Sequence, residues 1–180
     1  ILRAVLLVVL LSLNWIVSDT SFDLPKPAVK KIDKTLLAYF PETTINKKAL
    51  SLSNAEEKKL SFKLNENKFF QLWDNAELKG YMYIDKAKSK FDTFDYMVLF
   101  KPDLSIMTSK VLLYREDYGG EITSKRWLKQ FDDKANGEEM GLGNDIQVIS
   151  GATISCRSIT AGIKNLSKNI QELKSKGFLN

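Results

Sequence analysis

The sequence contains no histidine and only one cysteine among its 180 residues. Without histidine the chain lacks the commonest general base, the histidine partner of a Ser or Cys nucleophile, and every histidine-based metal site. The single cysteine, Cys156, excludes an intramolecular disulfide. If the protein carries out redox or group-transfer chemistry, we therefore expect a bound cofactor to supply it.

A strong excess of charge is also missing. The chain has 27 Lys and Arg against 22 Asp and Glu, a net charge of +5, and the lysines are scattered. A mild charge of this kind is typical of a solvated surface, so we expect no nucleic-acid partner. The length and the 44% hydrophobic content indicate one globular domain with a short appendage.

The appendage is the apolar N-terminal stretch, in which Arg3 is the only charged residue before Asp19. A basic residue followed by an apolar run is typical of a signal peptide or a membrane anchor, and both alternatives stay open for residues 1–18. This segment predicts an extracytoplasmic protein, either periplasmic or on the outer face of the cytoplasmic membrane. Membrane association through the N-terminus is expected.

Residues 19–50 are predicted to be a connector that contains a short amphipathic helix. Ile32, Leu36, Leu37 and Phe40 are expected on one face of this helix, with the lysines at 30, 31 and 34 on another, and Pro41 ends it. The helix either packs on the domain or lies at the membrane surface. The domain proper is assigned to residues 51–180.

The domain is predicted to contain an antiparallel sheet, because no helix of crossover length separates its apolar runs. The expected strands are residues 69–73, 78–84, 94–100 and 106–114, with a further strand at 146–149. Helices are expected from the capping box at 53–56 toward Leu64, from Thr123 or Ser124 to Phe131, and over 153–176. The predicted fold class is α+β, a twisted antiparallel sheet with packed helices that include a long C-terminal amphipathic helix.

The most informative stretch is Ser150-Gly151-Ala152-Thr153, which an apolar run enters and a helical pattern leaves. A strand, a small-residue turn and a helix start direct backbone N–H groups and the positive end of a helix at an anion. Gly151 and Ala152 leave room for a bulky group, and Thr153 adds a hydroxyl. The stretch predicts a phosphate site with a hydroxyl in reach, although Thr153 could instead be an ordinary helix N-cap.

Together with Ile154, Ser155 and the following helix, this motif resembles the FMN-binding domain family. That domain occurs in the FMN-carrying C subunit of sodium-translocating NADH:quinone reductase and in the G subunit of Rnf electron-transport complexes. The resemblance implies that a flavin transferase esterifies Thr153 to the phosphate of FMN, with Ser150, Gly151, Ala152 and Ser155 around that phosphate. The family usually has Asp where this chain has Gln147, so noncovalent FMN in the same cradle is the alternative.

A second stretch, residues 116–121, is similar to a glycine-containing acidic loop that lies near the flavin in this family. The resemblance implies that Glu116, Tyr118, Gly119 and Gly120 face the flavin, and aromatic side chains such as Tyr118 and Trp127 could stack on its ring. The implied function is an extracytoplasmic, covalent flavoprotein that relays electrons from a membrane donor to an extracytoplasmic acceptor. It is expected to be a redox carrier, or a subunit of an oxidoreductase, more than a stand-alone enzyme. The competing hypothesis is an exported binding module without redox chemistry that holds an anionic ligand at the helix start, residues 150–155.

Overall fold

The fold is a five-stranded antiparallel sheet in a computed structural model that describes residues 24–64 and 68–179. The predicted signal or anchor segment, residues 1–18, lies outside the described residues. The strands follow one another across the sheet in chain order, each antiparallel to its neighbour. They are β1 (Asn46–Ala49), β2 (Phe69–Asp74), β3 (Glu77–Lys88), β4 (Thr93–Phe100) and β5 (Ile106–Leu113). The predicted α+β class is confirmed.

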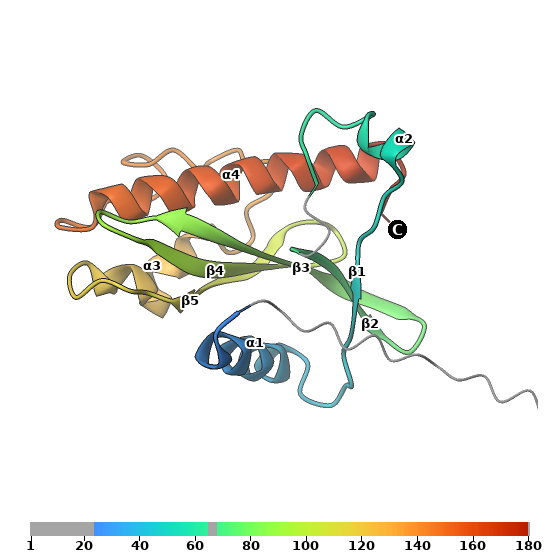
Figure 1. Ribbon diagram of the computed structural model, residues 1–180, viewed down its shortest axis with the longest axis horizontal. Coiled ribbons are helices and arrows are strands. Elements are labelled where there is room, and N and C mark those ends of the chain that lie inside the picture. Colours follow the sequence, from blue (N-terminus) through green and yellow to red (C-terminus); the bar gives the residue numbers. More distant parts are fainter. Residues whose placement is uncertain (1–23, 65–67, 180) are drawn as a thin grey trace, which may run out of the picture.

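Two helices cover opposite faces of this sheet (Figure 1). The long C-terminal helix α4 (Thr153–Ser175) lies along one face, and α1 (Lys26–Tyr39) packs on the other. The short elements are α2 (Asn54–Glu57), η1 (Gly120–Thr123), α3 (Lys125–Leu128) and η2 (Lys129–Phe131). None of the helices in the described part of the chain is long and apolar enough to cross a membrane.

The two-sided core follows from the alternation of side chains along the central strands. In β4, Phe94, Tyr96 and Val98 belong to the core beneath α4, whereas Met97 and Leu99 belong to the core beneath α1. All five are at most 1% exposed. Full burial of a large apolar side chain contributes about 1.5–3 kcal/mol, so β4 anchors both layers of the molecule.

Helix α1 packs on the domain, which is one of the two arrangements that the sequence left open. Ala28, Ile32 and Leu36 are buried against the sheet. The N–H of Phe40 closes the last turn on the Leu36 carbonyl at 2.8 Å, and Pro41 cannot continue the helix. The strand β1 follows within the residues assigned to the connector, and the sequence pattern did not predict it.

The helix predicted from Ser53 toward Leu64 is shorter than expected. The capping box forms, since Ser53 N–H donates to Glu56 Oε2 at 2.8 Å. The helix nevertheless ends at Glu57, and the chain turns so that the Ser61 N–H donates to Glu172 Oε1 of α4 at 2.7 Å. A long-range contact with α4 thus takes the place of further helical turns.

The strand predicted at residues 146–149 was wrong. Ile146 is buried and makes one isolated bridge with Leu142, but the next residues join no strand. Side chains satisfy the backbone here instead: Gln147 N–H donates to Gln130 Oε1 at 2.9 Å, and Trp127 Nε1 donates to the Gln147 carbonyl at 2.7 Å. The segment that precedes the motif is therefore an irregular one, whose backbone is bound by side chains and not by a neighbouring strand.

Candidate functional site

The Ser150–Thr153 motif forms a tight turn that leads directly into α4. The Ala152 N–H donates to the Ile149 carbonyl at 3.1 Å, and Gly151 has a φ of +82° that L side chains rarely adopt. Space is not the reason for this glycine, because an added Cβ would meet no atom within 4 Å. The glycine is needed for the backbone conformation of the turn, and the turn leaves the first residues of α4 exposed to solvent.

Thr153 is the first residue of α4 and not its N-cap. The N-cap position is Ala152, which offers no side-chain cap to the helix. The first backbone bond of the helix runs from Cys156 N–H to the Ala152 carbonyl at 2.9 Å. The ordinary capping role considered for Thr153 is therefore wrong.

The start of α4 leaves several hydrogen-bond donors unpaired. Within the described residues, no hydrogen bond satisfies the N–H groups of Thr153, Ile154 and Ser155, and the exposed Thr153 hydroxyl also has no partner. The first turn contains no acidic residue, so no carboxylate of that turn competes with a bound anion. Three free N–H groups at the positive end of a 23-residue helix fit a phosphate group.

The loop after β5 packs against this turn through Tyr114. The Tyr114 hydroxyl donates to the Tyr118 carbonyl at 3.1 Å and lies 3.2 Å from Ser155 Oγ. Gly119 has a φ of +76°, and a Cβ added there would lie 3.0 Å from both Ala152 Cβ and the Tyr114 hydroxyl oxygen. The two stretches predicted to flank the flavin are thus in direct contact at the start of α4.

The predicted site residues of this loop make different contacts, and not all of them lie against the motif. Gly119 touches the motif, Gly120 begins η1, and the Tyr118 side chain is 83% exposed. Glu116 instead accepts the N–H groups of Phe91 and Asp92, at 2.6 and 3.1 Å. The Ser89 hydroxyl and these backbone groups hold the pKa of the Glu116 carboxyl below its usual range. Glu116 therefore anchors the β3–β4 turn.

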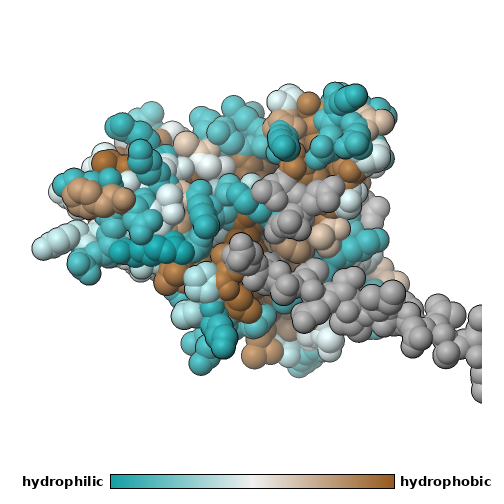
Figure 2. Space-filling view, in the orientation of Figure 1, coloured by the Kyte–Doolittle hydropathy of each residue, from teal (hydrophilic) through white to brown (hydrophobic). Residues whose placement is uncertain are grey.

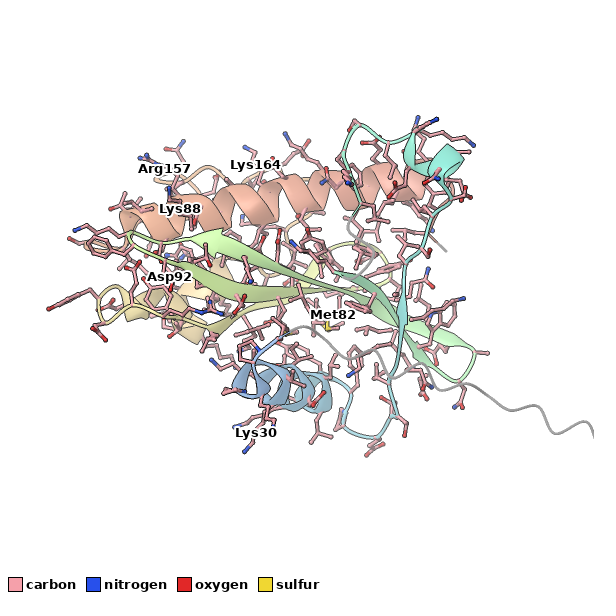
Figure 3. The ribbon with its side chains drawn as sticks, in the orientation of Figure 1. Lys30, Met82, Lys88, Asp92, Arg157 and Lys164 are labelled. Carbon is pink, nitrogen blue, oxygen red and sulfur yellow. The ribbon has the colours of Figure 1, made fainter. Side chains whose placement is uncertain are left out.

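The β3–β4 turn is also attached to the first turns of α4. Ser158 Oγ donates to the Lys88 carbonyl at 2.5 Å. Lys88, Asp92 and Arg157 consequently lie at one end of the molecule (Figure 3). Figure 2 shows this end as mostly hydrophilic, with small hydrophobic patches.

Trp127 lines a groove beside the motif. Its indole is only 5% exposed, is held by the Gln147 carbonyl, and packs edge-on against Phe131 with 5.5 Å between the ring centroids. The groove has a volume of about 360 Å³. Its lining comes from η1, α3, η2 and the segment before the motif, and includes Glu121, Arg126, Trp127, Gln130, Gln147 and Ile149. A buried indole offers a wall to a ligand and little free face for stacking.

The two polar residues before the motif have different environments. Asp145 Oδ2 accepts the Gly141 N–H at 2.7 Å and closes a tight turn. Gln147 is held only through its backbone, and its side chain is exposed at the groove. Asp145 is therefore committed to the turn, whereas the Gln147 side chain makes no hydrogen bond within the described residues.

Sequence reasoning missed two contacts that shape the site. One is the Tyr114 bridge, and the other is the ion pair of Arg115 with Asp95, which is 0% exposed. Arg115 also donates to the Thr93 carbonyl at 2.8 Å, so it fixes the base of the loop. The lone cysteine, Cys156, is fully buried, and burial raises the pKa of its thiol, which makes it a poor nucleophile.

Residues 90–168 match the family model for the FMN-binding domain. The predicted resemblance to this family is confirmed. The matched residues include the motif, the Tyr114 bridge and the loop that packs on them, and the match supports FMN as the cofactor. The curated proteins that were compared with this chain gave no match. The crystal structure of Shewanella oneidensis NqrC is similar over 71% of this chain and 70% of that chain, with 18% identity and a TM-score of 0.46.

Proposed function

We propose that this protein is a membrane-attached, extracytoplasmic electron carrier whose FMN is esterified through its phosphate to Thr153. One observation carries the proposal: within the residues that match the FMN-binding domain, α4 begins with an exposed, unpartnered threonine hydroxyl beside three free N–H groups. A hydroxyl that is neither a cap nor buried is available for modification. Its neighbours are donors that stabilise the negative charge of a phosphate ester.

The residues around Thr153 have separate tasks in this proposal. The N–H groups of the first turn of α4 hold the phosphate, and Gly151 supplies the turn that exposes them. Tyr114 and Gly119 keep the neighbouring loop against the turn, which leaves the exposed ring of Tyr118 beside the cofactor. In the groove, Trp127 and Ile149 are the apolar lining residues that the ring system can contact, beside polar and charged ones. Bound FMN supplies one- and two-electron redox chemistry, which no side chain of this chain replaces.

The proposed location rests on the sequence of residues 1–18. An apolar run with one basic residue favours export or anchoring. A covalent link is useful there, because a dissociated cofactor is lost by dilution outside the cytoplasm. The proposed partners are a flavin transferase, a membrane redox donor and an extracytoplasmic acceptor.

A second candidate is noncovalent FMN in the same cradle, which the exposed Gln147 favours. If the transferase reads an acidic side chain at this position, the natural chain is a weak substrate. Gln147 makes only backbone hydrogen bonds, so Gln147→Asp is expected to leave the fold intact. If Gln147→Asp carries more covalent flavin than the natural chain, Gln147 limits attachment. Equal covalent loading of the two forms would show that this position does not limit attachment.

The test is co-expression with and without a flavin transferase, followed by flavin fluorescence of the denatured protein on a gel. The natural chain is expected to keep fluorescence only with the transferase, and Thr153→Val is expected to lose it. Thr160→Val is the matched control, since Thr160 lies on the same helix but is 3% exposed with an unpartnered hydroxyl. Native protein that binds no flavin under any condition would instead support an anion-binding module.

A further inference from the structure

The outer face of α1 carries a regular row of lysines. Lys26, Lys30 and Lys34 are spaced by four residues, which places them along one side of the helix. All three are exposed, whereas the opposite side of α1 is buried on the sheet. Figure 3 shows Lys30 pointing away from the sheet. Leu37, three turns after Lys26, continues the row and is 63% exposed.

The charge of this row is not used within the described part of the protein. No ion pair joins Lys26, Lys30 or Lys34 to an acidic side chain there. The nearby acid Asp33 is paired with Lys47 at 3.4 Å. The row therefore presents three positive charges and one large apolar side chain to whatever lies beyond α1.

The sequence before α1 indicates what lies there. Residues 1–18 form the apolar run, and Lys26 follows Ser18 by eight residues. At about 3.6 Å per residue, eight residues span at most about 29 Å. If the run is held in a bilayer, Lys26 at the start of α1 cannot be farther than this from the membrane surface.

We infer that the lysine row of α1 binds the anionic phospholipid headgroups of the membrane that holds residues 1–18, with Leu37 at the interface. The chemistry is complementary, because clustered lysines beside a membrane segment are attracted to anionic lipids. A single exposed apolar residue on the same face adds contact with the acyl boundary. This inference rests on the proposed membrane attachment.

The orientation has a consequence for electron transfer. Because α1 and α4 cover opposite faces of the sheet (Figure 1), a membrane beneath α1 leaves α4 on the face turned away from the lipid. The Thr153 motif then stays open to an extracytoplasmic acceptor.

The experiment uses the full chain in vesicles, with an environment-sensitive fluorophore on Leu37→Cys. Cys156 is 0% exposed and escapes labelling, and the matched control label is on Lys168→Cys, on the exposed side of α4. Emission is compared between phosphatidylcholine and phosphatidylcholine mixed with phosphatidylglycerol. The row is tested by changing Lys26, Lys30 and Lys34 to Gln, against the same change at Lys168, Lys174 and Lys176. Vesicle flotation separately reports whether the chain is attached at all.

The expected result is a blue shift of the Leu37→Cys label only with phosphatidylglycerol, lost at 1 M salt, where the Debye length is about 3 Å. Each lysine near an anionic surface changes the equilibrium between membrane-bound and unbound α1 by roughly fivefold. The triple change in α1 should therefore lower this equilibrium constant on the order of a hundredfold. The α4 triple change and the α4 label should show no effect. A chain that floats but whose Leu37→Cys label ignores lipid charge overturns the inference and leaves the attachment standing. A chain that does not float overturns both.

Discussion

Replacement of Gly119 by alanine measures the contact between the two stretches that form the site. The φ of +76° at Gly119 costs an L residue about 1–2 kcal/mol. The added Cβ would also lie 3.0 Å from Ala152 Cβ and from the Tyr114 hydroxyl oxygen. Overpacking of this kind costs roughly 1–3 kcal/mol more. Gly119→Ala is therefore expected to lower the free energy of unfolding by about 2–5 kcal/mol.

Substitutions at two other glycines of the site distinguish the cost of the positive φ from the cost of the close Cβ contact. Gly151 has a φ of +82° but open space around it, so Gly151→Ala should cost only the conformational strain of about 1–2 kcal/mol. Gly120 has neither a left-handed backbone nor a neighbour within 4 Å, and Gly120→Ala should stay within about 0.5 kcal/mol of the natural protein. Urea denaturation followed by far-ultraviolet circular dichroism gives all three values. A cost for Gly119→Ala no larger than that for Gly151→Ala would refute the packing of the loop on the motif.

Three further predictions concern the contacts around this loop. Tyr114→Phe removes the hydroxyl that bridges Tyr118 and Ser155. It should lower the free energy of unfolding in urea by about 1–2 kcal/mol and alter the visible spectrum of the flavin-loaded protein. An unchanged spectrum would exclude a role of Tyr114 in positioning the flavin. The pKa of Glu116 is lower in the folded than in the unfolded state. Its contribution to the free energy of unfolding is therefore fully present above the unfolded-state pKa and is lost as the pH falls through the folded-state pKa. Glu116→Gln should therefore flatten the acid limb of the stability–pH curve, and an acid limb identical to that of the natural protein contradicts this role. Arg115→Met leaves the buried Asp95 carboxylate without its partner and should cost about 3 kcal/mol at neutral pH, with a milder loss for Arg115→Lys; equal stability of all three forms would show that the pair contributes nothing.

The regular elements were predictable because their residues form apolar runs in the strands or repeat with a helical period. The strands β2 to β5 contain apolar runs rich in strand-forming residues, and the final helix repeats apolar residues at steps of four and three from Ile159 to Leu173. By contrast, β1 has the sequence Asn-Lys-Lys-Ala, which carries no apolar alternation. It becomes a strand because the edge of β2 offers it backbone partners.

The site was predictable where one short stretch carries it and unpredictable where distant residues meet. The turn at Gly151 and the helix that starts at Thr153 follow from local chemistry. The hydroxyl contact of Tyr114 with Ser155 joins residues 41 positions apart, and no local pattern marks it. For the same reason residues 147–149 were mistaken for a strand, since the side chains of Trp127 and Gln130 that bind their backbone are distant in sequence.

The position of the flavin bond is the most direct test of the proposed carrier. Trypsin cleaves after Lys134 and Arg157, so one peptide, residues 135–157, contains Ser150, Thr153 and Ser155. After expression with a flavin transferase, fragmentation of this peptide should show an added mass of FMN less one water on Thr153. An adduct on either serine, or a peptide of unmodified mass from yellow protein, would contradict esterification at Thr153.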